Sequence, residues 1–295
     1  MSTERLLGEP VAAGIREEVR ERVETLGSRD VVPTLGTVLM SADPADRRFV
    51  ELKHDACERV GIEARDVRLD PGEPASRLYG AVERLSADPD VDAVFVQVPL
   101  PGGVEVSEVR ERIDPRKDVD CLAYEDLGRL VAGDPRFVPA TTAAVVRLLD
   151  AYDVAVEGCD LVVVGRSPVI GRPLANRLLR KELPGDATVT VCHSRTADLG
   201  SVTRRADVLV TACGVPELVD ASMLRPGVTV IDVSANRRPA DTDRGYEVIG
   251  DVDFESARAV ASAITPVPGG VGPVTLATLL GNVVLAAERR TDGGG

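Results

Sequence analysis

The chain has 295 residues, enough for two α/β domains, and its 44% of hydrophobic residues is ordinary for a globular protein. Its 48 acidic residues outnumber its 35 basic ones and give a formal net charge of −13, which argues against a nucleic-acid partner. No apolar run approaches the roughly 18 to 20 residues of a membrane span, and the first residues do not form a secretory signal. We therefore expect a cytoplasmic protein that binds no nucleic acid and no membrane.

The composition also bears on redox state, metals and salt. The five cysteines are widely spaced without a C-x-x-C pair, and there are two histidines, so we expect free thiols and no metal site. Only Lys53, Lys117 and Lys181 are lysines, and tryptophan is absent. With the acidic excess, this is typical of proteins that work in concentrated salt, where charge repulsion is screened. An acidic protein from a GC-rich genome is the alternative.

The first half of the chain alternates predicted helices and strands. In chain order we expect a helix at 10–27, a strand at 31–40, a helix at 46–60, a strand at 63–69, a helix at 74–86 and a strand at 91–101. Such alternation implies a parallel sheet with right-handed crossovers. After an irregular stretch, a helix over 141–152 is expected to link two domains.

The second half repeats the pattern. Short apolar strands are predicted at 159–165, 187–194, 206–214, 228–236 and 246–252. We expect all of them to lie in a second doubly wound parallel sheet. The apolar tail over 274–290 is predicted to be a helix that returns to the first domain.

A glycine-rich turn follows the first strand of the second series. "VVVGRSPVIGRP" places Gly165 at the end of the strand and Gly171 at the start of a helix, with Arg166 and Ser167 between them. Glycines allow close backbone approach, and a helix N-terminus offers free N–H groups to a pyrophosphate. Because the spacing is not G-x-G-x-x-G, the turn either binds a dinucleotide or is a purely structural tight turn.

The next strand bears on which dinucleotide would bind. An NAD site usually has an acidic residue about 20 residues further on, to bind the ribose 2′-hydroxyl. Here "VCHSRT" has no acid, and Ser194 and Arg195, with Arg166, could bind a 2′-phosphate instead. This favours NADP. The alternative is that "HSRT" caps a helix and Arg195 is solvated.

Three polar residues stand out in the first half. Gln97 interrupts "VFVQVPLP" at the carboxyl end of a strand, where open α/β sheets present ligand-binding groups. It could equally be a core glutamine with satisfied hydrogen bonds. Asp120, in "RKDVDCL", could be a loop carboxylate that caps its own backbone. Lys53 follows Phe49 by one helical turn in "FVELKHD".

Seven motifs occur in order along the chain: "FVELK", "VQVPLP", "KDVDCL", "VGRSPVIGRP", "VTVCHSRT", "GDVDF" and "TPVPGGVGPVT". In these motifs the sequence resembles the bifunctional methylenetetrahydrofolate dehydrogenase/cyclohydrolase (FolD) family over nearly its whole length. The resemblance implies two α/β domains with parallel sheets and a cleft between them. They would be a folate-binding domain at 1–141 with 274–295 and a Rossmann-like NADP-binding domain at 142–273, in a homodimer.

The resemblance also implies an activity. The family oxidises 5,10-methylenetetrahydrofolate to 5,10-methenyltetrahydrofolate with NADP, and then hydrolyses the product to 10-formyltetrahydrofolate, without a metal. By position, Lys53 resembles the catalytic lysine, Gln97 its partner and Asp120 the carboxylate that binds the pterin. A lysine can relay protons if burial and a nearby cation lower its pKa, whereas arginine cannot.

Further site residues follow from the same resemblance. The substrate-binding residues would be Phe49, Val98, Pro99, Leu100, Asp120, Pro268, Gly269 and Gly270. The cofactor-binding residues would be Gly165, Arg166, Ser167, Val169, Ser194, Arg195 and Ala235.

The sequence departs from the family pattern at several positions. Phe49 replaces the usual tyrosine and lacks its hydroxyl, and Cys121 replaces a glycine. "PATTAA" replaces P-C-T-P-x-G, and "DVSAN" replaces D-V-G-I-N. The loss of the hydroxyl makes a dehydrogenase with weak or no cyclohydrolase activity the nearest alternative. A non-catalytic NADP-binding sensor and an enzyme for another pterin carrier, such as a methanopterin, are the others.

Overall fold

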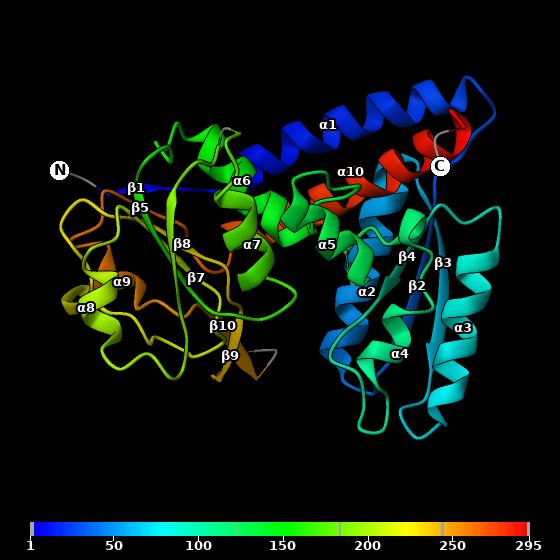
Figure 1. The fold of residues 1–295 in the computed structure, drawn as a ribbon. Helices are drawn as coiled ribbons and strands as arrows, with labels where there is room; N and C mark the ends of the chain where they lie inside the picture. The colour runs from blue at the N-terminus through cyan, green and yellow to red at the C-terminus, as the bar shows by residue number, and fades with distance from the viewer. Residues whose placement is uncertain (1–2, 122, 183, 243–244, 294–295) are drawn as a thin grey trace. The chain divides into compact units, whose positions relative to one another are not determined.

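The computed structural model describes residues 3–121, 123–182, 184–242 and 245–293, and it divides into two compact units (Figure 1). Unit 1 comprises Met1–Ala12 and Thr141–Thr275, and unit 2 comprises Ala13–Ala140 and Leu276–Gly295. Each unit is an α/β structure built on a parallel sheet, which confirms the expected fold class.

Unit 2 is built on a three-stranded parallel sheet in the order β3-β2-β4. Its strands are β2 (Thr34–Met40), β3 (Glu63–Leu69) and β4 (Ala93–Val96). Every residue of β2 and β4 is buried, as in parallel strands that are covered on both faces. Helices α2 (Pro44–Val60) and α3 (Ala75–Ala87) connect these strands and lie on either side of them in Figure 1. This is the arrangement that right-handed crossovers produce.

Both ends of α2 are defined by local chemistry. The Asp43 carboxylate accepts the N–H of Ala45 at 2.8 Å, and Pro44 occupies the first turn. Gly61 ends the helix with a φ of 82°, in the left-handed region that favours glycine. The caps therefore determine where Lys53 lies along α2.

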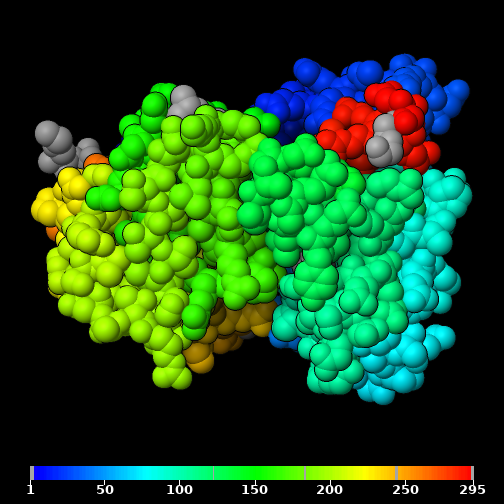
Figure 2. Space-filling model, in the orientation of Figure 1, coloured from blue at the N-terminus to red at the C-terminus, as the bar shows by residue number. Residues whose placement is uncertain are grey.

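Further helices complete unit 2. They are most of α1 (Gly8–Gly27), α4 (Val106–Arg110), the 3-10 turn η1 (Pro115–Lys117), α5 (Tyr124–Ala132) and the C-terminal part of α10 (Val271–Thr291). Figure 2 shows atoms of α1 against those of α10, where Arg22 pairs with Glu288 at 2.6 Å. On α10, the buried Asn282 donates from Nδ2 to Val119 O at 2.8 Å and to Val138 O at 3.0 Å. The predicted return of the tail to the first half of the chain is therefore observed.

Unit 1 is built on a six-stranded parallel sheet in the order β1-β11-β8-β7-β5-β6. The strands are β1 (Glu4–Arg5), β5 (Asp160–Val164), β6 (Thr188–Cys192), β7 (Val208–Thr211), β8 (Thr229–Asp232) and β11 (Ala263–Ile264). Its helical elements are α6 (Ala140–Ala151), α7 (Gly171–Leu178), α8 (Leu199–Thr203), the 3-10 turn η2 (Ala221–Met223) and α9 (Phe254–Ala257). The doubly wound sheet predicted for the second half is present.

One predicted strand does not join that sheet. β10 (Tyr246–Ile249) pairs antiparallel with β9 (Asn236–Pro239) in a separate two-stranded sheet, so its assignment to the parallel sheet was wrong. The residues of both strands are half-buried or exposed, and they lack the apolar run of a strand that is covered on both faces.

The N-terminal residues also differ from the expected domain division, which assigned residues 1–12 to the first domain. The structure assigns them to unit 1, where β1 pairs in parallel with β11. Glu4 N–H donates to Ser262 O and Leu6 N–H donates to Ile264 O, both at 2.9 Å. The side chain of Leu6 is fully buried. This segment adds one edge strand to the sheet. A strand of two residues is too short to show a pattern from which it could be predicted.

Helix α10 is long and apolar enough, by length and composition, to cross a membrane. However, 56% of its most apolar 18-residue window is buried inside the protein. A core helix has these properties, and the contacts of Asn282 agree with that interpretation.

We expect Asn282→Ala to lower the free energy of unfolding by about 2–3 kcal/mol, because it removes two hydrogen bonds and leaves two carbonyls without this donor. Denaturant titration followed by circular dichroism measures the change. Asn176→Ala is the matched control, since among the described residues Asn176 donates only to Arg172 O of its own helix, and its effect should stay within about 0.5 kcal/mol. Equal effects of the two substitutions would contradict the role of Asn282.

Candidate active site

The chain order of the unit 2 strands reverses between β2 and β4, because the chain runs from β2 outward to β3 and then back to β4. Open α/β sheets bind ligands beside the carboxyl ends of the strands at such a point. Gln97 follows β4 at this edge, and its N–H donates to Val38 O at 3.0 Å. Lys53 reaches the same place from α2 and donates from Nζ to Gln97 Oε1 at 3.2 Å. The structure therefore brings the predicted Lys53 and Gln97 together.

Two aromatic rings lie close to the Lys53 ammonium. Nζ is 4.4 Å from the ring centroid of Phe95 and 5.6 Å from that of Phe49. Phe95 is buried on β4, and it was not among the site residues predicted from the sequence. Its position in the sequence could have identified it. Residues two apart on a strand lie on the same face, so Phe95 lies on the same face as Gln97. The rings attract the cation without accepting its proton.

Burial lowers the pKa of Lys53 to about 8, although the carboxylates of Asp120 and Asp46 act in the opposite direction. The family resemblance predicts that a nearby cation contributes to a low pKa of Lys53, whereas burial alone lowers it in the structure. With this pKa, about a tenth of Lys53 is neutral at pH 7. The side chain can therefore both accept and donate a proton near neutral pH.

Asp120 acts on Lys53 through its charge. Burial and the neighbouring Asp118 raise the pKa of Asp120 to about 7, while Lys53 opposes that shift and Ala140 donates its N–H to the carboxylate. Asp118 is buried, and its Oδ2 accepts the N–H of Ala123 at 2.5 Å. An isolated bridge also pairs Asp118 with Val94 of β4. These contacts attach the loop that carries Asp120 to the sheet.

The other predicted substrate residues of unit 2 are more exposed. Phe49 has a relative exposure of 50%, and Pro99 is exposed beside the half-buried Val98 and Leu100. Gln97 Nε2 donates to Val98 O at 2.6 Å, and the Val98–Pro99 peptide bond is cis. Exposed apolar groups thus adjoin the Lys53–Gln97 pair, where a flat aromatic substrate could stack.

Unit 1 has its own reversal of strand order, between β5 and β7. Gly165 follows β5 with a φ of 142°, and a Cβ on it would lie 2.3 Å from Ala212 O, just after β7. A Cβ on Gly171 would lie 2.2 Å from Gly165 O. Only glycine allows these approaches, so the turn packs closely between two strand ends and the start of α7. Pyrophosphates bind at turns of this kind.

The predicted cofactor-binding side chains of this turn lie at or near its surface. Arg166 is exposed, Val169 is half-buried, and Ser167 Oγ accepts the N–H of Ile170 at 3.0 Å. The Ser167 hydroxyl thus stabilises the turn and leaves the guanidinium of Arg166 in solvent.

Ser194 and Arg195 lie just after β6, the neighbour of β5, and both are exposed. The following helix α8 is capped by Asp198, whose side chain accepts the N–H of Ser201 at 3.0 Å. The "HSRT" segment therefore does not provide the helix cap, which leaves Ser194 and Arg195 available to a ligand.

Asp251, which lies in the motif "GDVDF", connects several loops of unit 1, and its role was not predicted from the sequence. Its carboxylate accepts six hydrogen bonds, from Cys213 N (2.7 Å), Cys213 Sγ (3.1 Å), Gly214 N (3.2 Å), Val215 N (2.8 Å), Ser234 Oγ (2.6 Å) and Asn236 Nδ2 (3.0 Å). Burial alone would raise the pKa of Asp251, but the bonds from Ser234 and Asn236 outweigh it and lower the pKa. The exposed Ala235 lies between two of these donors.

Pro268, Gly269 and Gly270 also belong to unit 1. Gly8 N–H donates to Gly269 O at 2.8 Å, and a Cβ on Gly8 would lie 1.8 Å from Gly270 O. Gly269 has a φ of 108°, which L side chains rarely adopt. The predicted site residues thus belong to two sets, one around Lys53 in unit 2 and one in unit 1 that includes Gly165 and Gly269.

Two protein-family models match the chain. The model for the tetrahydrofolate dehydrogenase/cyclohydrolase catalytic domain matches residues 6–120, and the model for the NAD(P)-binding domain of the same enzymes matches residues 139–291. The chain belongs to the tetrahydrofolate dehydrogenase/cyclohydrolase family. Within this family it is similar to bifunctional protein FolD 1 of the halophile Haloarcula marismortui, with 50% identity over 290 residues that cover 98% of each chain.

Solved structures of the family have the same fold. The bifunctional FolD of Campylobacter jejuni is 38% identical, with a TM-score of 0.91 over 98% of this chain and 100% of that one. The FolD of Trypanosoma brucei, solved with NADP and an inhibitor, is 34% identical, with a TM-score of 0.94 over 99% of each chain. The resemblance inferred from the seven motifs is therefore confirmed.

Cys121, which replaces a glycine of the family pattern, occupies a glycine-like backbone conformation. Its φ is 54°, in the left-handed region, which costs an L residue about 1–2 kcal/mol. The buried thiol donates to Phe137 O at 3.2 Å, and burial raises its pKa. The buried contact compensates for part of the backbone strain.

We expect Lys53 to titrate near pH 8 and, in Asp120→Asn, at a lower pH, because Asp120 raises the pKa of Lys53. NMR of protein with 13C-labelled lysine measures this directly, since the chain has only three lysines. Lys53→Arg assigns the signal. Asp55→Asn is the control, because Asp55 lies on the same helix and pairs with Arg48, and it should leave the midpoint unchanged. A Lys53 midpoint near 10.5 in the unchanged protein would contradict the proposed burial effect.

Proposed function

We propose that this protein oxidises 5,10-methylenetetrahydrofolate to 5,10-methenyltetrahydrofolate with NADP and hydrolyses the product to 10-formyltetrahydrofolate. The observation that carries this proposal is the Lys53 ammonium, which is hydrogen-bonded to Gln97 at the carboxyl end of β4 and has a pKa near 8. Family membership supports both activities, because the curated relative from Haloarcula marismortui is named as bifunctional.

The dehydrogenase step depends mainly on positioning. The carbon that loses hydride lies between two nitrogens whose lone pairs stabilise the cation, so no acid or base is needed there. NADP, when bound, accepts the hydride. Phe49 offers a face for the aromatic part of the substrate, and Asp120 offers an acceptor for pterin N–H donors. In this role Asp120 must be ionised, which substrate N–H groups would favour.

The cyclohydrolase step depends on Lys53. Water attacks the amidinium carbon of the methenyl product, loses a proton, and a ring nitrogen must gain a proton as the ring opens. Neutral Lys53 can take the proton from water, and the resulting ammonium can return one to nitrogen. Gln97 Oε1 accepts one N–H of Lys53 and thereby orients the amine. Burial, in a site where the Phe95 ring lies 4.4 Å from Nζ, keeps the amine poorly solvated and lowers its pKa.

The residues around Gly165 fit a dinucleotide phosphate, because the positions where side chains would clash are glycines. Arg166 and Arg195 are exposed at the ends of neighbouring strands, and no carboxylate occupies the position that binds a ribose 2′-hydroxyl in NAD sites. Two guanidinium groups suit a 2′-phosphate. We therefore assign the cofactor as NADP and propose that unit 1 binds it while unit 2 carries the catalytic lysine.

The cellular setting is also proposed from the family and the composition. A homodimer in the cytoplasm, active in one-carbon metabolism, is what the family resemblance implies. The acidic excess, the scarcity of lysine and the similarity to a protein of a halophile favour function in concentrated salt.

A specific observation favours one alternative, a dehydrogenase with weak cyclohydrolase activity. Phe49 lies 5.6 Å from Lys53 Nζ but has no hydroxyl to bind the amine or a water. A non-catalytic sensor is less favoured, because Lys53, Gln97 and Asp120 are retained with the pKa and contacts of a proton-transfer group. Separate assays of NADPH formation and of methenyltetrahydrofolate hydrolysis distinguish the bifunctional enzyme, the dehydrogenase and the sensor.

In Lys53→Arg we expect hydrolysis of methenyltetrahydrofolate to fall by about 10²–10⁴-fold, because arginine keeps the charge but cannot exchange the proton. NADPH formation from methylenetetrahydrofolate should fall much less. Absorbance assays of the two reactions, with tetrahydrofolate and methanopterin substrates at low and high salt, measure both. Normal hydrolysis in the variant would refute the role of Lys53, and no NADPH formation by the unchanged protein would favour the sensor.

In Arg195→Gln we expect the KM for NADP to rise at least about tenfold while the KM for NAD stays the same, because the substitution removes a charged hydrogen bond to the 2′-phosphate. Initial-rate kinetics with both cofactors measures this. Arg225→Gln is the matched control, since Arg225 pairs with Asp207 at the opposite end of β7. An unchanged KM for NADP in Arg195→Gln would refute the assignment.

A further inference from the structure

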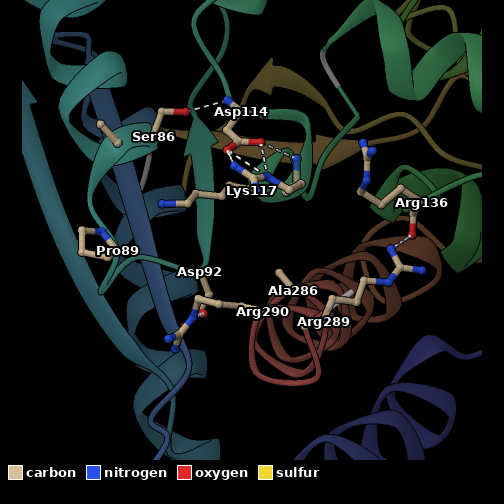
Figure 3. Close-up of a pocket in the computed structure, with 12 residues that line it drawn as sticks. Ser86, Pro89, Asp92, Asp114, Lys117, Arg136, Ala286, Arg289 and Arg290 are labelled. Carbon is tan, nitrogen blue, oxygen red and sulfur yellow. Dashed lines mark hydrogen bonds and ion pairs between the residues drawn. The ribbon is translucent and has the colours of Figure 1, made fainter. Parts of the chain in front are cut away.

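Unit 2 contains a cavity of about 690 Å³ at the edge of its sheet opposite to Lys53 (Figure 3). Asp92, which lines the cavity, immediately precedes β4, whereas Gln97 immediately follows it. Because a strand rises about 3.3 Å per residue, these two residues are roughly 17 Å apart. The cavity is therefore separate from the Lys53–Gln97 pair.

Basic residues outnumber acidic residues in the lining of the cavity, whereas acidic residues predominate in the chain as a whole. Its cationic lining residues are Arg116, Lys117, Arg136, Arg289 and Arg290. Its carboxylates are Asp92 and Asp114. Arg116 and Lys117 come from η1, and Arg289 and Arg290 come from the last turn of α10; these two segments approach the cavity from opposite sides in Figure 3. Arg136 comes from the loop after α5. A concentration of positive charge in a protein with a net charge of −13 indicates an anionic ligand.

Three of the five cations are already paired with carboxylates. The pairs are Arg290 with Asp92 (2.5 Å), Arg116 with Asp114 (2.6 Å), and Arg136 with Glu125 (2.9 Å) and Asp126 (3.1 Å). These pairs position the walls of the cavity. The charges of these three arginines are already balanced by carboxylates without a ligand.

Lys117 and Arg289 differ from the other three. Among the carboxylates that the structure describes, none lies within ion-pairing distance of either side chain. Lys117 Nζ donates to Asp88 O at 2.6 Å, and Arg289 Nη1 donates to Arg136 O at 2.5 Å. Both are partly buried, and burial lowers the pKa of each more than the surrounding carboxylates raise it. Carboxylates act on both cations from a distance, mainly Asp114 on Lys117 and Asp126 on Arg289. Among the described residues, none of these carboxylates accepts a hydrogen bond from either cation, so each cation has further N–H groups that could donate to an anionic ligand.

The size and the remaining lining indicate the class of ligand. Small-molecule sites typically measure about 300–1,000 Å³, so this cavity can hold more than a simple ion. Ala87, Pro89 and Ala286 provide apolar wall. Arginine binds phosphate through paired N–H groups, and lysine binds it as a point charge. A ligand that spans Lys117 and Arg289 needs several acceptor oxygens.

We propose that this cavity is a binding site for a small phosphate-bearing molecule, with Lys117 and Arg289 as its principal contacts. The site is independent of the proposed enzymatic function, because it lies at the other end of the sheet.

Isothermal titration of inorganic pyrophosphate into the full-length protein tests the site. The protein is saturated with NADP, so that the cofactor site cannot account for the heat. The unchanged protein should bind one pyrophosphate, and Lys117→Gln should bind it at least about tenfold more weakly, as expected for the loss of a charged hydrogen bond. Glutamine can still donate to Asp88 O, so this variant is expected to fold. Arg289→Lys, which keeps the charge but loses the paired N–H groups, should also weaken binding.

Arg77→Gln is the control, because Arg77 lies in the same unit and pairs with Glu73 at the far end of α3. It should bind pyrophosphate like the unchanged protein. The proposal is refuted if NADP-saturated protein gives no binding heat, or if Lys117→Gln and Arg289→Lys bind as tightly as the control. Citrate binding as tight as pyrophosphate binding would overturn the assignment of phosphate as the ligand class.

Discussion

The candidate site depends on one constraint, that the ammonium of Lys53 is held where water cannot fully solvate it and no carboxylate hydrogen-bonds to it in the described residues. The Phe95 ring attracts the cation, and Gln97 supplies a neutral acceptor. Neither interaction replaces full hydration, so the protonated form is disfavoured. A carboxylate in direct contact would have the opposite effect and would hold the proton on nitrogen.

Both units position their functional groups at the carboxyl edge of a parallel sheet, but they use different means. Unit 2 presents side chains, since β4 supplies Phe95 and Gln97 and the capped helix α2 supplies Lys53. Unit 1 presents backbone groups instead. Gly165 and Gly171 allow the ends of β5 and β7 and the start of α7 to pack closely around one turn. The difference suits a reaction in which the substrate needs proton transfer and the cofactor needs binding and orientation.

Much of this could be predicted from sequence, because strand–helix alternation and the motif containing Gln97 are local features. The pairing of β9 with β10 could not, since short strands of mixed polarity fit either an antiparallel pair or a parallel sheet until tertiary contacts select one. Phe95 was missed because an apolar residue on a buried strand normally only packs, and its contact with Lys53 depends on the placement of α2. The role of Asp251 was hidden for a similar reason, because its donors come from separate loops.

The six hydrogen bonds of Asp251 also affect how the loops that they join respond to salt. All of the donors are neutral groups, whereas a surface pair such as Arg238 and Glu247 joins two full charges. At 1 M ionic strength the Debye length is about 3 Å, so exposed charge pairs lose much of their attraction while contacts between a carboxylate and adjacent dipoles do not. The loops that Asp251 connects are therefore anchored in a way that does not depend on ionic strength.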